Sequence, residues 1–152
     1  MVTGAVLLVA LVGIYFVAAA FIPRWWANHV GHSVNGRLAT GALLGFCFGV
    51  VFTILPLGLL WITLGRNLSW KIMALWIAVA VLLAAPNLMT LGVTLGSGSG
   101  SHAGQRTMDV QAPMFRGATL IGALVAIAVF VALIVAFRRR GRPPAATPPA
   151  AT

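Results

Sequence analysis

Acidic side chains are almost absent from this chain, since Asp109 is the only Asp or Glu among its 152 residues. Catalysis by a pair of carboxylates, one acting as acid and the other as base, is therefore excluded. Small proton-coupled multidrug exporters need a carboxylate inside the membrane, and the long apolar segments of this chain contain none. A proton-driven exporter of that kind is excluded as well.

Cysteine and histidine are also scarce. The only cysteine, Cys47, lies in an apolar run, so the chain has no internal disulfide and lacks the paired thiols of thiol-oxidising quinone enzymes. Haem bound across a membrane needs histidines on facing helices, whereas His29, His32 and His102 all fall between the apolar segments. We therefore expect no enzyme activity, no catalytic residues and no cofactor.

Charged residues make up only 7% of the chain and hydrophobic residues 61%, whereas an ordinary soluble domain has about 25% charged residues. Such a chain cannot cover itself with polar surface in water, so the composition indicates a bilayer. The net charge of +9 comes from basic residues spread between apolar runs. This distribution favours contact with anionic lipid and not with nucleic acid.

Four apolar segments are long enough to cross the hydrocarbon core, which takes about 20 residues. None of them contains a charged residue or a histidine, and each is closed by proline, glycine or arginine. The sequence predicts an all-α integral membrane bundle of four transmembrane helices within residues 1–137. The predicted spans are residues 2–22, 38–64, 72–95 and 117–137, and residues 138–152 form a basic, then proline-rich, disordered cytoplasmic tail.

Lysine and arginine predict the orientation, because their excess stays in the cytoplasm. Six of them lie in the segment after the second span and in the tail, and four lie in the other two loops. Both termini are therefore expected to be cytoplasmic, in a bacterial plasma membrane. Arg24 and Arg37 beside the first outer loop count against this orientation.

The stretch FIPRWWANHVGH, residues 21–32, then becomes the end of the first span and the start of an outer loop. Trp25 and Trp26 are expected at the level of the lipid headgroups, where an apolar ring with one N–H donor is best accommodated.

An alternative interpretation of the same stretch is a metal site. His29 and His32 share one face if this loop is helical, and the other outer loop brings His102 and Asp109 to the same side of the membrane. Three imidazoles and a carboxylate are a sufficient ligand set for zinc or another divalent metal. His102, however, follows a flexible Gly/Ser run, which does not preorganise a site.

Small residues recur every four positions on two of the predicted spans. Such stripes let another helix backbone approach closely in lipid. They predict helix packing, either of the two spans against each other or against a second copy of the chain. The residues are Gly41, Gly45 and Gly49 on the second span, extended by Thr53, and Ala118, Gly122 and Ala126 on the fourth.

Polar residues form one stripe inside a span, at Asn87, Thr90 and Thr94. The stripe either lines a hydrated vestibule or makes hydrogen bonds between helices. Pro56 and Pro86 each remove a backbone hydrogen bond, so we expect kinks there.

Arginines gather just after the last span. Each arginine near an anionic leaflet contributes about 1 kcal/mol, so we expect this cluster to hold lipid headgroups. Its members are Arg138, Arg139, Arg140 and Arg142.

The segments PRWWANHVG, FTILPL and APNLMTLG, together with the glycine stripe, resemble small four-span membrane proteins of high-GC bacteria that are labelled permease without an assigned substrate. The resemblance covers most of the chain and implies membrane residence, but no residue roles. Our main hypothesis is an accessory or scaffold subunit of a larger membrane complex, with the small-residue stripes as contact faces. The alternative is a small permease or channel formed by oligomerisation around the polar stripe.

Overall fold

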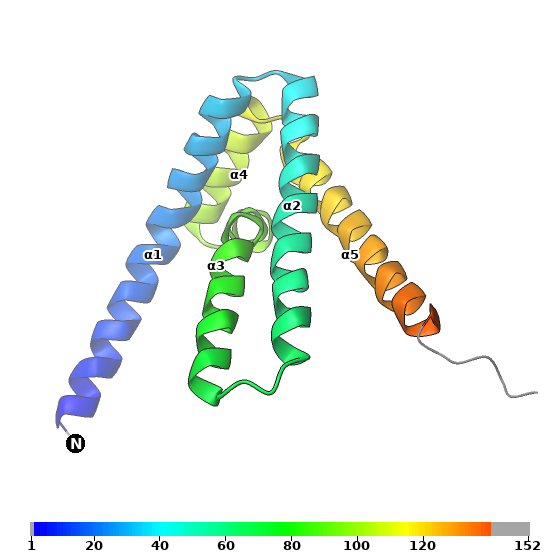
Figure 1. The fold of residues 1–152 in the computed structure, drawn as a ribbon. Coiled ribbons are helices and arrows are strands. Elements are labelled where there is room, and N and C mark those ends of the chain that lie inside the picture. Colours follow the sequence, from blue (N-terminus) through cyan, green and yellow to red (C-terminus); the bar gives the residue numbers. More distant parts are fainter. Residues whose placement is uncertain (1, 141–152) are drawn as a thin grey trace, which may run out of the picture.

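The computed structural model describes residues 2–140, which form five helices and no strand (Figure 1). Four of the helices are long and apolar enough to cross a membrane. The predicted all-α class is confirmed, and the protein is a multi-pass membrane protein by this criterion. The helices are α1 (Val2–Val34), α2 (Leu38–Leu64), α3 (Trp70–Leu95), α4 (Ser99–Gln111) and α5 (Phe115–Arg140).

The helix bounds differ from the predicted spans mainly at α1. α2 coincides with the predicted span 38–64, and α3 and α5 begin slightly earlier than predicted. α5 also continues to Arg140, so the first three residues of the predicted tail are helical. The rest of that tail lies outside the described residues.

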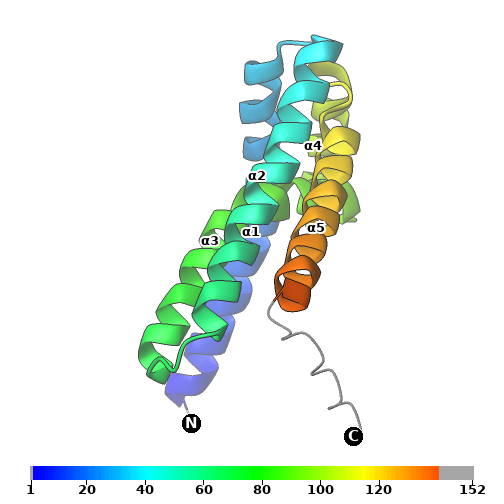
Figure 2. The same ribbon diagram turned by 45° about the vertical axis from the view of Figure 1, so that its right-hand side comes forward.

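The helices meet at one end of the molecule and diverge toward the other. The start of α1, the α2–α3 connection and the end of α5 lie at the diverging end, which we call the terminal end (Figure 1). The α1–α2 turn and the α4–α5 connection lie at the opposite end, which we call the α4 end. α3 and α5 pack on different sides of α2 (Figure 2), and α4 packs along α1.

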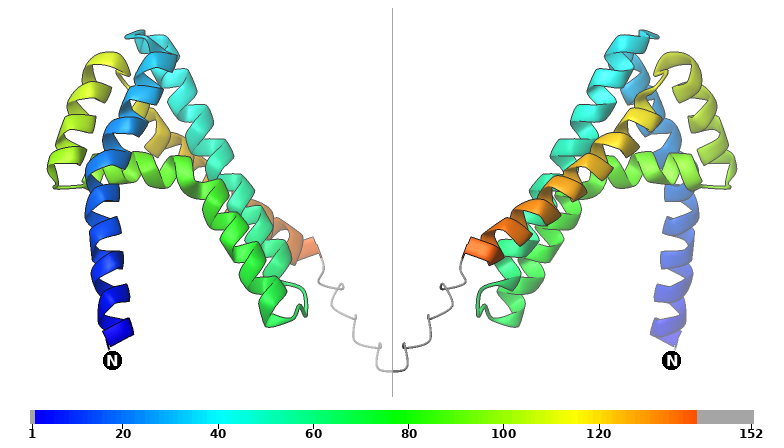
Figure 3. Two further views of the ribbon diagram at one scale, coloured as in Figure 1. Left: turned by 90° about the vertical axis from the view of Figure 1, so that its left-hand side faces the viewer. Right: turned by 90° about the vertical axis from the view of Figure 1, so that its right-hand side faces the viewer.

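α3 bends sharply in its middle, whereas α2 passes through Pro56 without a bend of that size (Figure 3). The first half of α3 runs beside α2, and the second half turns across the molecule toward α1 and α4. Pro86 lies in this helix and lacks the N–H that would bond to the carbonyl of Leu82, which accounts for the bend. The bend brings the polar stripe of α3 into the space between the other helices.

The prediction that the first span ends at Pro23 was wrong, because α1 continues through this proline to Val34. Its 33 residues give a length of about 50 Å, well beyond a hydrocarbon core of about 30 Å. Proline cannot donate to the carbonyl of Ala19. Two glycines of α4 cover this region of α1: a Cβ added at Gly100 would lie 2.6 Å from the Ala19 oxygen, and one at Gly104 would lie 2.9 Å from the Pro23 oxygen.

The outer loop predicted as flexible contains helix α4, which begins at Ser99 within the Gly/Ser run, and residues 96–98 of that run connect α3 to α4. Two of its side chains bind carbonyls in the last turn of α3: Ser101 shares the Gly92 oxygen with the backbone N–H of Gly96, whereas Gln105 binds two carbonyls that lack helical partners. Ser101 Oγ donates to the Gly92 oxygen at 3.2 Å, and Gln105 Nε2 donates to the oxygens of Val93 and Thr94 at 2.8 and 3.1 Å. α4 therefore closes the end of α3 and fixes it against α1.

The buried core lies at the α4 end, where α1, α3, α4 and α5 meet. Elsewhere most large apolar side chains are exposed, as expected for helices whose solvent is lipid. The core cluster consists of Trp26, Ala27, Val30, Val34, Val93, Met108, Ala112 and Phe115.

The small-residue stripes of α2 and α5 lie against each other. A Cβ added at Gly45 would lie 3.0 Å from the Phe115 Cα and 3.1 Å from the Ala118 Cβ, and one at Gly49 would lie 3.0 Å from the Gly122 Cα. At Gly41 the added atom would overlap the carbonyl of Pro113, and Ala118, Gly122 and Ala126 are buried. These stripes are thus occupied within the chain.

We predict that Gly45→Ala lowers the free energy of unfolding by about 1–3 kcal/mol, because the new methyl group would overlap the backbone of α5 at Phe115 and push the two helices apart. Gly58 on the same helix is the matched control, since no described atom lies within 4 Å of its added Cβ. Thermal unfolding of both variants in mild detergent measures the difference. Equal stability of Gly45→Ala and Gly58→Ala would contradict the packing described here.

Candidate functional site

Trp26 is buried between the helices and is not free to contact lipid headgroups, which corrects the predicted headgroup contact of this residue. Its side chain is only 6% exposed, and Nε1 donates to Thr90 Oγ1 at 3.0 Å. The ring also packs near Phe48 of α2, with 6.3 Å between centroids. This tryptophan therefore joins α1 to the bent half of α3.

Asn87 joins α3 to α2. Its Nδ2 donates to Thr53 Oγ1 at 2.9 Å and to the Gly49 oxygen at 3.3 Å. Its Oδ1 is buried and has no hydrogen-bond partner among the described residues. Unpaired buried oxygens of this kind are uncommon in folded proteins.

The two threonines of the polar stripe bond to their own helix. Thr90 Oγ1 donates to the Pro86 oxygen at 2.9 Å, and Thr94 Oγ1 donates to the Thr90 oxygen at 2.8 Å. The stripe thus makes hydrogen bonds within α3 and between helices, which was one of the two alternatives open from the sequence. Its residues also border a groove.

This groove has a volume of about 880 Å³ and lies between α2, α3 and α5. Leu57, Leu60, Ile77 and Ile127 form its walls toward the terminal end. Its polar lining residues include Asn87, Thr90 and Thr94 of α3, Thr53 of α2, and Arg116 and Thr119 at the start of α5. We call this space the α2–α3–α5 groove.

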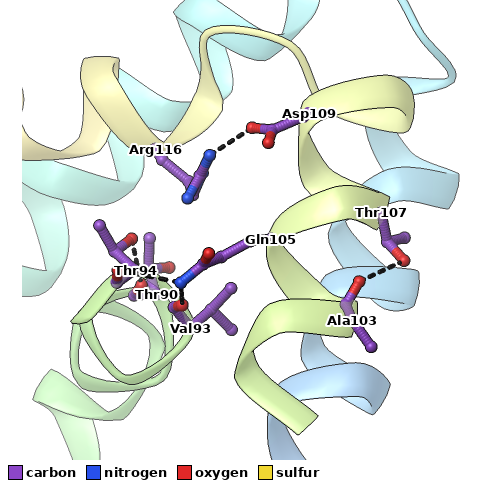
Figure 4. Close-up of polar contacts among 8 residues, drawn as sticks. All are labelled: Thr90, Val93, Thr94, Ala103, Gln105, Thr107, Asp109 and Arg116. Carbon is purple, nitrogen blue, oxygen red and sulfur yellow. Dashed lines mark hydrogen bonds and ion pairs between the residues drawn. The ribbon is translucent and has the colours of Figure 1, made fainter. Parts of the chain in front are cut away.

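Arg116 stands at the α4 end of this groove and forms an ion pair with Asp109 of α4 (Figure 4). The arginine side chain is 26% exposed and the aspartate side chain 60% exposed. Sequence reasoning did not single out Arg116. The sequence feature that could have identified it is its position, immediately before an apolar span and seven residues after the only acidic residue of the chain.

The histidines do not gather. His29 stacks on Trp25 at 5.7 Å between ring centroids, His32 is exposed on the last turn of α1, and His102 is exposed on the first turn of α4. Residues 2–140 contain no group of three or more His, Cys, Asp or Glu side chains placed to hold a metal ion. The metal hypothesis therefore gains no support from the described part of the chain.

Among the predicted headgroup contacts, Trp25 is 47% exposed. At the terminal end, the Arg138 guanidinium lies 5.7 Å from the centre of the Trp61 ring, and Arg139 is exposed. A cation beside a tryptophan is typical of a membrane interface. The side chain of Arg140, like Arg142, is outside what the structure describes.

Comparisons with known proteins do not assign this chain to a family, so its class is argued from the fold. No family model, no curated protein and no solved structure matches the chain. The four apolar helices define a multi-pass membrane protein, and any narrower assignment depends on the surfaces described above.

We predict that Thr90→Val lowers the free energy of unfolding by about 0.5–2 kcal/mol, because it leaves the buried Trp26 N–H without an acceptor. Thr94→Val is the matched control, since that hydroxyl donates only to a carbonyl of its own helix. Unfolding followed by tryptophan fluorescence in mild detergent compares the two. If Thr94→Val costs as much as Thr90→Val, the hydrogen bond from Trp26 is not what holds α1 to α3.

Proposed function

We propose that this membrane protein is an accessory or scaffold subunit that holds a transmembrane helix of a partner protein between α1 and α3. The observation that carries this proposal is a second groove, of about 540 Å³, along these two helices. We call it the α1–α3 groove.

Small side chains form much of the lining of the α1–α3 groove. Helices associate in lipid through close packing, because the hydrophobic effect does not separate protein from acyl chains. A groove with a small-residue floor lets a further helix approach closely. The small lining residues are Ala18 and Ala19 of α1 and Ala78, Ala85 and Gly92 of α3.

The contact face proposed here differs from the one expected from sequence. The stripes on α2 and α5 are occupied by each other, so they are not available to a partner. On α1, by contrast, Gly13 has no described atom within 4 Å of its added Cβ, and most side chains of the first half of this helix are exposed. The α1–α3 groove therefore offers small residues to a partner, and the exposed apolar first half of α1 extends this surface.

A permease for polar solutes has less support. Thr90 and Thr94 donate to carbonyls of α3, and the Asn87 amide nitrogen bonds to α2. Permeation needs polar groups that are free to replace the hydration of a solute. These donors are engaged within the bundle, and the Asn87 Oδ1 acceptor alone is left unpaired among the buried side chains of the described residues.

We predict that Ala18→Phe releases the partner, because the larger side chain fills the α1–α3 groove. The measurement is affinity purification of the full chain from native membranes in mild detergent, followed by native mass spectrometry. The wild type is expected to retain a larger membrane protein in fixed stoichiometry.

Ala128→Phe is the matched control, since Ala128 of α5 is exposed and borders neither groove. Both variants must unfold at the wild-type temperature for the comparison to hold. Recovery of the wild type only as a monomer or homo-oligomer would overturn the proposal.

A further inference from the structure

We propose that the α2–α3–α5 groove binds an anionic phospholipid, with an acyl chain along the apolar walls and its phosphate against Arg116. This inference goes beyond the proposed function, because it concerns a different groove and a small ligand. The lipid site can be tested independently of any partner helix between α1 and α3.

The size and lining of the groove fit such a ligand. Its volume of about 880 Å³ falls within the range of about 300–1,000 Å³ that is usual for ligand pockets. The walls toward the terminal end are formed by leucine and isoleucine, at Leu57, Leu60, Ile77 and Ile127. An acyl chain matches this lining, whereas a polar solute finds no hydrogen-bonding partner there.

The rim of the groove is continuous with the surface that faces the bilayer. Leu88, Leu91 and Leu95 of α3 and Leu120 of α5 line the groove, and each is about half exposed or more. α5 also leaves the line of α2 toward the terminal end (Figure 1). A lipid therefore reaches the groove sideways from the membrane, without first entering water.

Charge selects the head group. Arg116 is the one charged residue that lines the groove within the described chain, and it lies at the start of α5, where the helix dipole adds positive potential. Its planar guanidinium has five donors and binds phosphate or carboxylate through two parallel hydrogen bonds. The phosphate of a phospholipid is such an anion, and the exposed rim of the groove faces the phospholipids of the bilayer.

In the absence of lipid, the Asp109 carboxylate forms an ion pair with the Arg116 guanidinium. The carboxylate is on α4, and its side chain is 60% exposed, so water weakens the ion pair. A ligand anion in the partly enclosed groove replaces this carboxylate and releases it to solvent. The single acid of the chain thus acts as an internal competitor for the lipid head.

The test is a lipid titration of the delipidated full chain in mild detergent, followed by native mass spectrometry. Dioleoyl phosphatidylglycerol and dioleoyl phosphatidylcholine have the same chains, but only the first has a net negative head. Both lipids carry a phosphate, but the choline cation of phosphatidylcholine competes with Arg116 for it. We therefore expect phosphatidylglycerol to bind about tenfold more tightly. Equal affinity of the two lipids would overturn the proposal.

Substitutions at the ion pair separate a lipid site from a structural salt bridge. Arg116→Gln is expected to abolish the preference for phosphatidylglycerol, whereas Asp109→Asn is expected to strengthen its binding severalfold by removing the competitor. Arg106→Gln on the exposed face of α4 is the control, because this arginine does not line the groove. A salt bridge with only a structural role predicts that both changes lower stability and that neither changes lipid affinity.

A groove-filling variant keeps the test independent of Arg116. Leu120 lines the groove and is 59% exposed, so Leu120→Trp fills the space without disturbing the core. This variant is expected to bind both phospholipids weakly while it unfolds like the wild type. Unchanged binding by Leu120→Trp would place the lipid elsewhere. Oleate titrated alone tests the choice of lipid: weaker binding of oleate than of phosphatidylglycerol supports a phospholipid site, and tighter binding of oleate would overturn it.

Discussion

Direct contact between helix backbones at glycine is the constraint on which the rest of this structure depends. In lipid the hydrophobic effect gives helices little reason to associate, so close packing must supply the attraction. Gly45 and Gly49 bring α2 against α5, and Gly100 and Gly104 bring α4 against α1. The second contact covers the part of α1 around Pro23, where the helix lacks one of its own hydrogen bonds, and it lets α1 continue into the core at the α4 end.

Hydrogen bonds between helices then fix the bent half of α3. Trp26 bonds to Thr90, Asn87 bonds to Thr53, and Gln105 bonds to the last carbonyls of α3. Each of these bonds satisfies a polar group that would be costly to leave unpaired in a nonpolar environment. The bend at Pro86 and the helix α4 therefore support each other, because the end of α3 reaches α4 only after the bend.

Divergence of the helices toward the terminal end leaves two grooves that share α3 as a wall. One is floored by small residues and suits a helix, and the other is apolar with an arginine at one end and suits a lipid anion. The proposals for a partner protein and for a bound lipid thus follow from the same bend in α3. They differ in which neighbouring helix completes the site.

The sequence by itself determined the number of membrane spans, because length and apolarity suffice for that, and it located α2 to the residue. It also showed the four-residue spacing of small side chains on α2 and α5. Tertiary structure decided which surface each stripe meets, since a second copy would satisfy the same spacing. Tertiary structure also decided the conformation at Pro23 and in the Gly/Ser run, which locally favour a helix end and a loop. Packing of α4 along α1 outweighs these local preferences at Pro23 and from Ser99 onward, and only the fold brings Arg116 to the end of a groove.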